Sequence, residues 1–215
     1  MRVVVFDLDG TLVDSIGEIL ESFSATARAF GLPFDEAAVR ALIGRPLRET
    51  FRRLYPGEDP DPLVAFYREH HLAHLGERAR PFPGVERVLG ELKAAGFPLA
   101  VATTKRTATA RRLLLRVGLF PFFDHVQGTD GGMAPKPAPD VVVAAARAAG
   151  GRPGWMVGDT ALDLRAGRAA GARVYAVTWG AGSPEALAAL APDRLEPTLD
   201  ALPEALGLAR AKGNG

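Results

Sequence analysis

The pattern that most constrains the fold is a series of short apolar runs, each the length of one β-strand, separated by helical patterns. The apolar runs lie near residues 2–6, 98–102, 124–127, 154–158 and 173–177, and the helical patterns lie around 85–95, 107–117, 140–149 and 161–170. This alternation predicts an α/β fold, a Rossmann-like parallel sheet flanked by helices on both faces. Ligands of such sheets bind beyond the carboxyl ends of the strands, so polar residues at those ends are the candidate functional residues.

The first apolar run ends in two acids, Asp7 and Asp9, which Gly10 and Thr11 follow. Side chains at positions i and i+2 of a strand share a face, which predicts two carboxylates that point the same way, about 7 Å apart. Two like charges at this spacing raise each other's proton affinity unless a cation joins them. Mg²⁺ prefers such oxygen ligands. The alternative is a solvated turn, because Asp-Gly is a common turn pair.

The second polar end consists of Thr103, Thr104 and Lys105, after the apolar run 99–102. A helix is predicted to begin near Thr107. Hydroxyl groups and free backbone N–H groups at a strand-to-helix turn form a good anion site. Capping of the helix by threonine would use the same residue types, so both interpretations stay open at this point.

Lysine is rare in the chain, and two lysines lie in these strand-end loops. Four of the 26 lysine and arginine residues are lysines, at positions 93, 105, 136 and 212. Because an ammonium group is a compact point charge whereas a guanidinium is a wide planar fork, Lys105 and Lys136 suit a crowded site with a phosphoryl group and several carboxylates. Chance placement is the alternative.

Two further acids follow the apolar run 154–158, Asp159 at once and Asp163 four residues later. If a helix begins after Gly158, the two acids lie one turn apart on the same side of its first turn. A metal site fits this spacing, and so do two acids that merely interact with the positive end of the helix dipole.

Together these segments resemble the haloacid dehalogenase superfamily of phosphohydrolases. The sequences DLDGT, VATTK, KPAPD and GDTALD match its four motifs in order, and the match spans nearly the whole chain. Within the superfamily the chain most resembles the bacterial phosphoglycolate phosphatase group, which the residues after the fourth motif, 177–180, support. The resemblance implies a Mg²⁺-dependent phosphomonoester hydrolase that acts on a small-molecule phosphate, 2-phosphoglycolate first, through an aspartyl-phosphate intermediate.

The resemblance also implies roles for the acids. Asp7 is the expected nucleophile, and Asp9 is the general acid that later becomes the general base. Mg²⁺ is expected to bind Asp7, the backbone carbonyl of Asp9, and Asp159. Asp163 is expected either to bind the metal or to orient its ligands.

The phosphoryl group is expected to bind Thr103 together with the backbone amides of Leu8 and Thr104. Lys136 is expected to neutralise charge on the nucleophile and on the transferring group. Lys105 either contacts the substrate or borders the site. The family usually has Asn where this chain has Thr104, so a role for that side chain does not follow from the resemblance.

Residues 14–80 interrupt the alternation with helical patterns alone, over 15–30, 35–43, 47–54 and 63–75. We expect an inserted α-helical cap domain at 14–80 and a core domain made of residues 1–13 and 81–215. Gly44 and Arg45 lie in a loop of this cap, where the family often carries a specificity loop. Arg45 is predicted to bind an anionic end of the substrate, although a solvated arginine at a helix end is the alternative.

Three histidines of the expected cap, at 70, 71 and 74, lack the accompanying acid of the HExxH pattern and do not predict a metal site. A dehalogenase is disfavoured because Asp9 is present. A phosphonate-cleaving enzyme is disfavoured because residues 14–80 contain no lysine. A phosphatase of sugar phosphates or pyrophosphate, a β-phosphoglucomutase-like phosphomutase and a receiver-like phospho-Asp signalling domain remain alternatives.

Composition limits the partners. The net charge of +1 gives no reason to expect nucleic acid, and no apolar stretch reaches the length of a membrane span. The absence of cysteine excludes disulfides and zinc–thiolate sites. With no signal peptide recognised before the first strand, we expect a cytoplasmic monomer or homodimer that binds a small-molecule phosphate.

Overall fold

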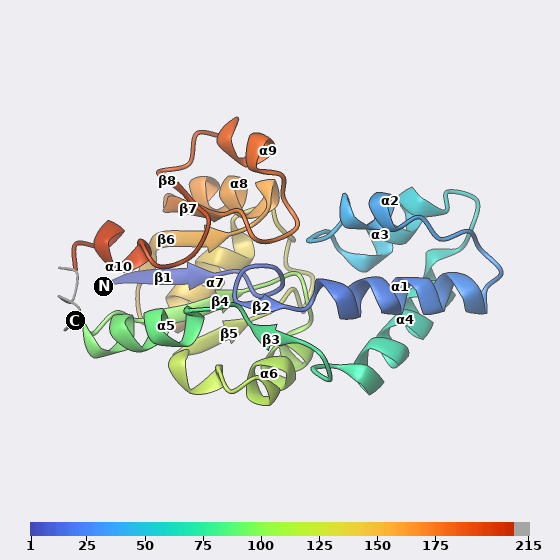
Figure 1. Ribbon diagram of the computed structural model, residues 1–215, viewed down its shortest axis with the longest axis horizontal. Coiled ribbons are helices and arrows are strands. Elements are labelled where there is room, and N and C mark those ends of the chain that lie inside the picture. The colour runs from blue at the N-terminus through green and yellow to red at the C-terminus, as the bar shows by residue number, and fades with distance from the viewer. Residues whose placement is uncertain (209–215) are drawn as a thin grey trace.

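The computed structural model describes residues 1–208 and forms an α/β unit with a helical lobe beside it (Figure 1). The main sheet has the strand order β5-β4-β1-β6-β7-β8, and every neighbouring pair is parallel. Its strands are β1 (Arg2–Phe6), β4 (Leu99–Ala102), β5 (His125–Gln127), β6 (Arg152–Gly158), β7 (Arg173–Val177) and β8 (Arg194–Glu196). The predicted fold class, a Rossmann-like parallel sheet flanked by helices, is confirmed.

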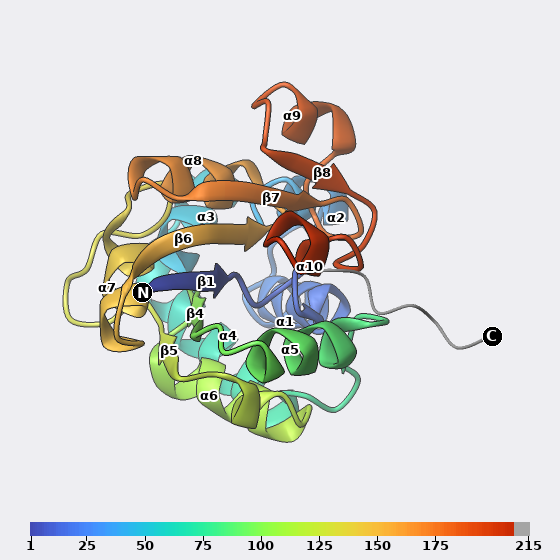
Figure 2. The same cartoon turned by 90° about the vertical axis from the view of Figure 1, so that its left-hand side faces the viewer.

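Helices cover both faces of this sheet (Figure 2). They are α5 (Val85–Ala94), α6 (Thr107–Arg116), α7 (Asp140–Ala148), α8 (Ala161–Ala169), α9 (Pro184–Ala188) and α10 (Leu202–Ala205), with a 3₁₀ turn at Phe120–Phe122. Alternate residues of β1 face opposite sides, as the period of two requires. Val4 and Phe6 pack with α5, α6 and α10, whereas Val3 and Val5 pack with α7, α8 and α9.

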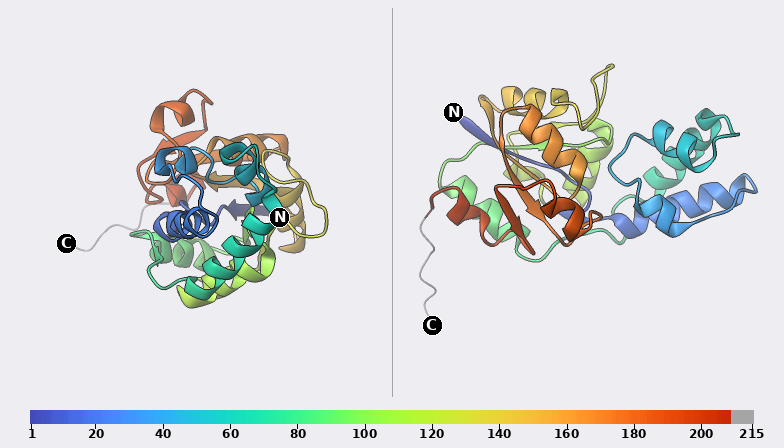
Figure 3. Two further views of the ribbon diagram at one scale, coloured as in Figure 1. Left: turned by 90° about the vertical axis from the view of Figure 1, so that its right-hand side faces the viewer. Right: turned by 90° about the horizontal axis from the view of Figure 1, so that it is seen from above.

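The helical lobe comprises α1 (Ile16–Ala29), α2 (Glu36–Arg40), α3 (Leu47–Leu54) and α4 (Pro60–His74). It has an apolar core of its own, centred on Phe23, Phe51 and Tyr67, and it extends away from the sheet (Figure 3). The two chain crossings to this lobe pair as a short antiparallel ribbon, β2 (Val13–Asp14) with β3 (Arg80–Pro81). The two ends of the inserted segment, predicted at residues 14 and 80, therefore lie side by side.

The predicted elements agree with the structure to within a few residues, with two kinds of exception. Helix α4 begins at Pro60 rather than near Leu63, because the Asp59 side chain caps it and proline suits the first helical turn. The short elements β8, α9 and α10 were not predicted. Residues 209–215 lie outside the described residues. Among the described residues, no helix is long and apolar enough to cross a membrane.

Candidate active site

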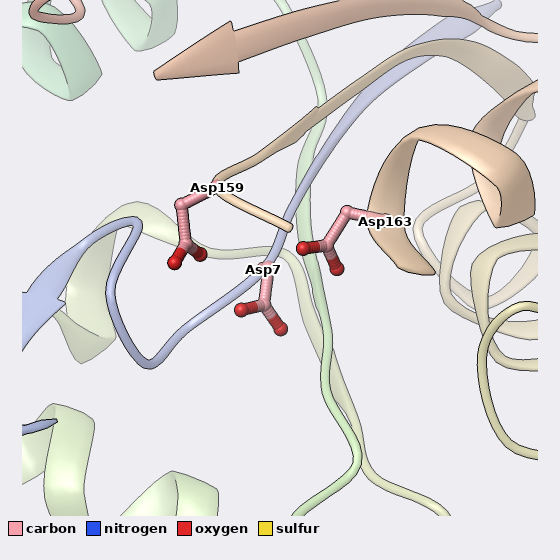
Figure 4. A group of neighbouring side chains, drawn as sticks. All are labelled: Asp7, Asp159 and Asp163. Atoms are coloured by element: carbon pink, nitrogen blue, oxygen red, sulfur yellow. The ribbon is translucent and has the colours of Figure 1, made fainter. Parts of the chain in front are cut away.

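Three acidic side chains meet beyond the carboxyl ends of β1 and β6. Asp7 directly follows β1, Asp159 directly follows β6, and Asp163 lies in the first turn of α8. All three are buried, and one carboxylate oxygen of each lies within 4.8 Å of the others. Figure 4 shows the carboxylates converging from their separate elements. The sheet edge thus brings together acids that lie far apart in the chain.

Lys136 is the cation that faces this acidic cluster. Its ammonium group donates hydrogen bonds to one oxygen of Asp7 and one of Asp163, and at 3.2 Å to the backbone carbonyl of Ala102. Burial by itself lowers the pKa of Lys136, but the two carboxylates raise it above its ordinary value. The ammonium therefore stays charged, and it holds Asp7 and Asp163 in place.

The cluster carries more negative charge than Lys136 balances. Three carboxylates against one ammonium leave a formal charge of −2 in a buried site, which is unfavourable without a further cation. Burial, reinforced by Asp163, raises the pKa of Asp159 to about 7. Burial also raises the pKa of Asp7. Because a hard divalent cation takes oxygen ligands and restores the charge balance, this donor set fits Mg²⁺.

Asp159 and Asp163 do not share the first helical turn as predicted. Helix α8 begins at Ala161, so Asp159 lies in the loop before it and the side chain of Thr160 caps the helix. One oxygen of Asp163 accepts hydrogen bonds from the Thr160 backbone N–H at 3.0 Å and from its hydroxyl at 2.5 Å. Asp163 therefore closes a capping box while its other oxygen binds Lys136.

Asp9 lies apart from the acidic cluster. Its Oδ1 accepts a hydrogen bond from the Ser15 hydroxyl at 2.5 Å, and its Oδ2 lies 3.0 Å from the Lys105 ammonium. Burial on its own raises the pKa of Asp9, but Lys105 and Ser15 bring it below its ordinary value. Asp9 is thus ionised and has a cation of its own.

The prediction that Asp7 and Asp9 share one strand face assumed that the strand continues through Asp9. Because β1 ends at Phe6, the strand alternation does not extend to these two acids. Asp7 pairs with Lys136, whereas Asp9 pairs with Lys105. The two carboxylates therefore have different partners, which suits the different roles expected of them: nucleophile for Asp7, and general acid and base for Asp9.

The turn after β4 places Thr103 at the sheet edge, where it is buried. Its hydroxyl oxygen accepts a hydrogen bond from the Lys105 backbone N–H at 3.2 Å, so the hydroxyl proton can be donated elsewhere. In the described part of the chain, no acceptor binds the backbone N–H of Leu8 or of Thr104. These three donors suit the oxygens of a phosphoryl group.

The loop between α2 and α3 of the helical lobe lies next to the start of α8 in the α/β unit. Gly44 has a φ of +90°, and a side chain there would contact Thr160 and Leu162 at 3.5 to 3.6 Å. Arg45 lies next to it, with an Nη1 atom 2.8 Å from Oε1 of Glu49. Its side chain is 30% exposed. The pairing of Arg45 with a substrate anion stays a prediction.

Several groups that hold Asp159 were not predicted. The Thr11 hydroxyl donates to one of its oxygens at 2.7 Å, and the Ala181 backbone N–H donates to the other at 2.8 Å. A side chain at Gly10 or at Gly180 would collide with this carboxylate. Gly10 and Thr11 directly follow Asp9 in the sequence, so the first acid motif could have identified them. Gly180 and Ala181 had no such signal.

Comparisons with known proteins agree with this geometry. Residues 4–177 match the family described as haloacid dehalogenase-like hydrolase. A probable phosphatase of Dickeya dadantii, IndB, is 37% identical over 97% of this chain and 94% of its own. A phosphoglycolate phosphatase of Aquifex aeolicus is 32% identical over 84% of this chain and 86% of its own. A haloacid dehalogenase-like hydrolase of Streptococcus pneumoniae has a TM-score of 0.86 at 31% identity, covering 95% of this chain and 98% of its own.

The chain therefore belongs to the haloacid dehalogenase-like hydrolase family. The predicted resemblance to this family, and within it to the phosphoglycolate phosphatases, is confirmed, and the chain is a phosphatase of this family.

Proposed function

We propose that this protein is a Mg²⁺-dependent phosphomonoester hydrolase that acts on a small molecule through an aspartyl-phosphate formed on Asp7. The observation that supports this proposal most strongly is the buried acidic cluster of Asp7, Asp159 and Asp163 with Lys136. A divalent cation would balance the formal charge of this cluster, and Asp7 is the member that directly follows the central strand β1. Mg²⁺, when bound, would supply positive charge against the carboxylates and the phosphoryl oxygens.

In the first step a carboxylate oxygen of Asp7 attacks phosphorus, and the bond to the leaving oxygen breaks. Asp9 donates a proton to that oxygen, which departs as an alcohol. In the second step Asp9 takes a proton from water, and the resulting hydroxide displaces Asp7 from phosphorus. Inorganic phosphate leaves and both acids return to their starting states. The separation of Asp9 from the acidic cluster frees it for these proton transfers.

Thr103, the backbone amides of Leu8 and Thr104, and Lys136 would stabilise charge on the transferring group. Donors that are already oriented cost no reorganisation when charge develops on the phosphoryl oxygens. The Asp9 carboxylate must take up a proton before it acts as an acid. Because Lys105 and Ser15 lower the pKa of Asp9, a looser contact with Lys105 in the substrate complex would favour this protonation.

The helical lobe would be the cap, at residues 14–80, on a core made of residues 1–13 and 81–215. Its loop at Gly44 lies against α8 beside the acidic cluster, where it can cover a bound substrate. We propose 2-phosphoglycolate as the first candidate substrate, because relatives at 32–36% identity are phosphoglycolate phosphatases. Sugar phosphates and pyrophosphate, and a phosphomutase reaction, are the alternatives. A cytoplasmic location and a monomeric or dimeric state are part of the proposal.

The test is phosphate release from a panel of phosphoesters by the purified protein, with Mg²⁺ and with EDTA. The panel contains 2-phosphoglycolate, hexose phosphates, nucleotides and pyrophosphate, and Asp7→Asn is the blank. We expect Mg²⁺-dependent release that the Asp7→Asn variant lacks. Release that persists in Asp7→Asn would refute the nucleophile, and a stable phospho-Asp7 without turnover would favour the receiver-like alternative.

A further inference from the structure

The segment 178–182, which follows β7, lies closely against Asp159. The backbone N–H of Ala181 donates to the Asp159 carboxylate at 2.8 Å, and the backbone N–H of Gly182 donates to the Asp159 carbonyl at 3.2 Å. Between them and the strand lies Gly180, where a side chain would collide with the same carboxylate. Because two hydrogen bonds and a close backbone approach join the segment to Asp159, a displacement of Asp159 must either displace the segment or break these contacts.

The same segment carries Trp179, whose indole ring stacks on the phenyl ring of Phe82. The ring centroids are 4.6 Å apart, and the ring planes lie 6° from parallel. The indole Nε1 is buried and has no hydrogen-bond partner among the described residues. The orientation of the indole is therefore set by apolar packing and by the stack on Phe82, and not by a hydrogen bond.

Phe82 belongs to the connection between the core and the helical lobe. It directly follows β3, and its backbone N–H donates at 3.1 Å to the carbonyl of Leu12, which directly precedes β2. Phe82 is thus joined to both chain crossings. Ala181 provides a second contact with the lobe, because it packs against the apolar core of the lobe. The segment that holds Asp159 is therefore also attached to the lobe and to its crossings.

We propose that Trp179 and Phe82 are positioning residues that couple Mg²⁺ binding at the acidic cluster to the position of the helical lobe. The inference rests on the Mg²⁺ site of the proposed function and adds a connection from that site to the lobe. With Mg²⁺ bound, the excess negative charge around Asp159 is offset, so Asp159 and the segment 178–182 are held more firmly. The stack passes this constraint to the crossings. Because coupling between two sites is reciprocal, loss of the stack must also weaken Mg²⁺ binding.

The first measurement is the dissociation constant of Mg²⁺, by isothermal titration calorimetry on the folded protein without substrate. Phe82→Leu removes the stacked ring and keeps an apolar side chain, whereas Trp179→Phe keeps an aromatic ring beside Phe82. Phe97→Leu is the matched control, because Phe97 is half-buried against the same apolar cluster but precedes β4, at the amino ends of the strands. We expect Phe82→Leu to weaken Mg²⁺ binding about fivefold or more, Trp179→Phe to weaken it less, and Phe97→Leu to leave it unchanged.

The second measurement needs no variant. It is the hydrogen exchange of backbone amides in the unchanged protein, followed by NMR with Mg²⁺ and with EDTA. Mg²⁺ should slow the exchange of the Phe82 N–H more than that of the Phe97 N–H, which donates to the Leu92 carbonyl at 3.0 Å and serves as the control amide.

Three results would overturn the inference and leave the phosphatase proposal intact. They are equal slowing at the Phe82 and Phe97 amides, an unchanged dissociation constant in Phe82→Leu, and an equal weakening in Phe97→Leu. The absence of Mg²⁺ binding to the unchanged protein would instead overturn the Mg²⁺ site of the proposed function, and the inference with it.

Discussion

Replacement of Lys136 by methionine tests whether the acidic cluster depends on one internal cation. Met keeps most of the apolar stem and removes the ammonium that binds Asp7, Asp163 and the carbonyl of Ala102. The site is buried, so water cannot replace these contacts. The variant leaves the buried carboxylates without a positive charge from the protein. Breaking a buried ion pair in this way lowers the unfolding free energy, because the remaining charges are uncompensated.

The expected loss is about 3–5 kcal/mol of unfolding free energy without Mg²⁺, the range typical of removing one partner from a buried ion pair. Mg²⁺ supplies two positive charges to the same carboxylates, so we expect it to reduce this loss substantially. It cannot replace the ammonium beside the transferring phosphoryl group. The rate kcat should therefore fall about 100-fold or more even with saturating Mg²⁺.

The assay is urea denaturation at neutral pH, with EDTA and with Mg²⁺, followed by phosphate release under the same conditions. Lys93→Met is the matched control, because Lys93 pairs with Asp124 at a position where both side chains are about one-third exposed. Such a pair contributes about 0–1 kcal/mol. A loss in Lys136→Met no larger than in the control, or one that Mg²⁺ does not reduce, would refute the charge argument.

Two further predictions concern the metal and the cap loop. Because the pKa of Asp159 is raised to about 7, metal-free protein keeps a proton there at lower pH that Mg²⁺ must displace. Mg²⁺ should therefore raise the melting temperature more at about pH 8 than at about pH 6; an equal shift at both, by scanning calorimetry, would contradict this. Arg45→Ala should raise KM for 2-phosphoglycolate about tenfold, with little change in kcat, if its guanidinium binds the carboxylate; steady-state kinetics that show an unchanged KM for every substrate would rule out that role.

The sheet could be predicted because its strands are buried on both faces. Each strand of a doubly covered parallel sheet is a continuous apolar run, and each run here ends where polar residues begin. The short elements escaped prediction for the opposite reason. Helix α10 has four residues and β8 has three, too few to show a period. Strands β2 and β3 have two residues each and exist because the two crossings to the helical lobe pair with each other.

The cluster residues could be predicted because Asp7, Asp159 and Lys136 each follow or precede a recognisable element. Their arrangement could not, because it depends on where each element stops. The prediction for Asp9 assumed that the strand continued past Phe6, and the prediction for Asp159 assumed that the helix began two residues before Ala161. In each case one or two residues at an element boundary decide which partner a carboxylate has.

The helical lobe shows a different limit. Its buried polar contacts include pairs such as Ser22 with His71, which lie on separate helices and have no local spacing to relate them. Sequence patterns place both residues on helices, yet Ser22 also donates to a third group, the backbone carbonyl of Glu18. The residues of the acidic cluster thus lie in short motifs at strand ends, whereas the packing of the helical lobe depends on contacts between helices that only the folded chain brings together.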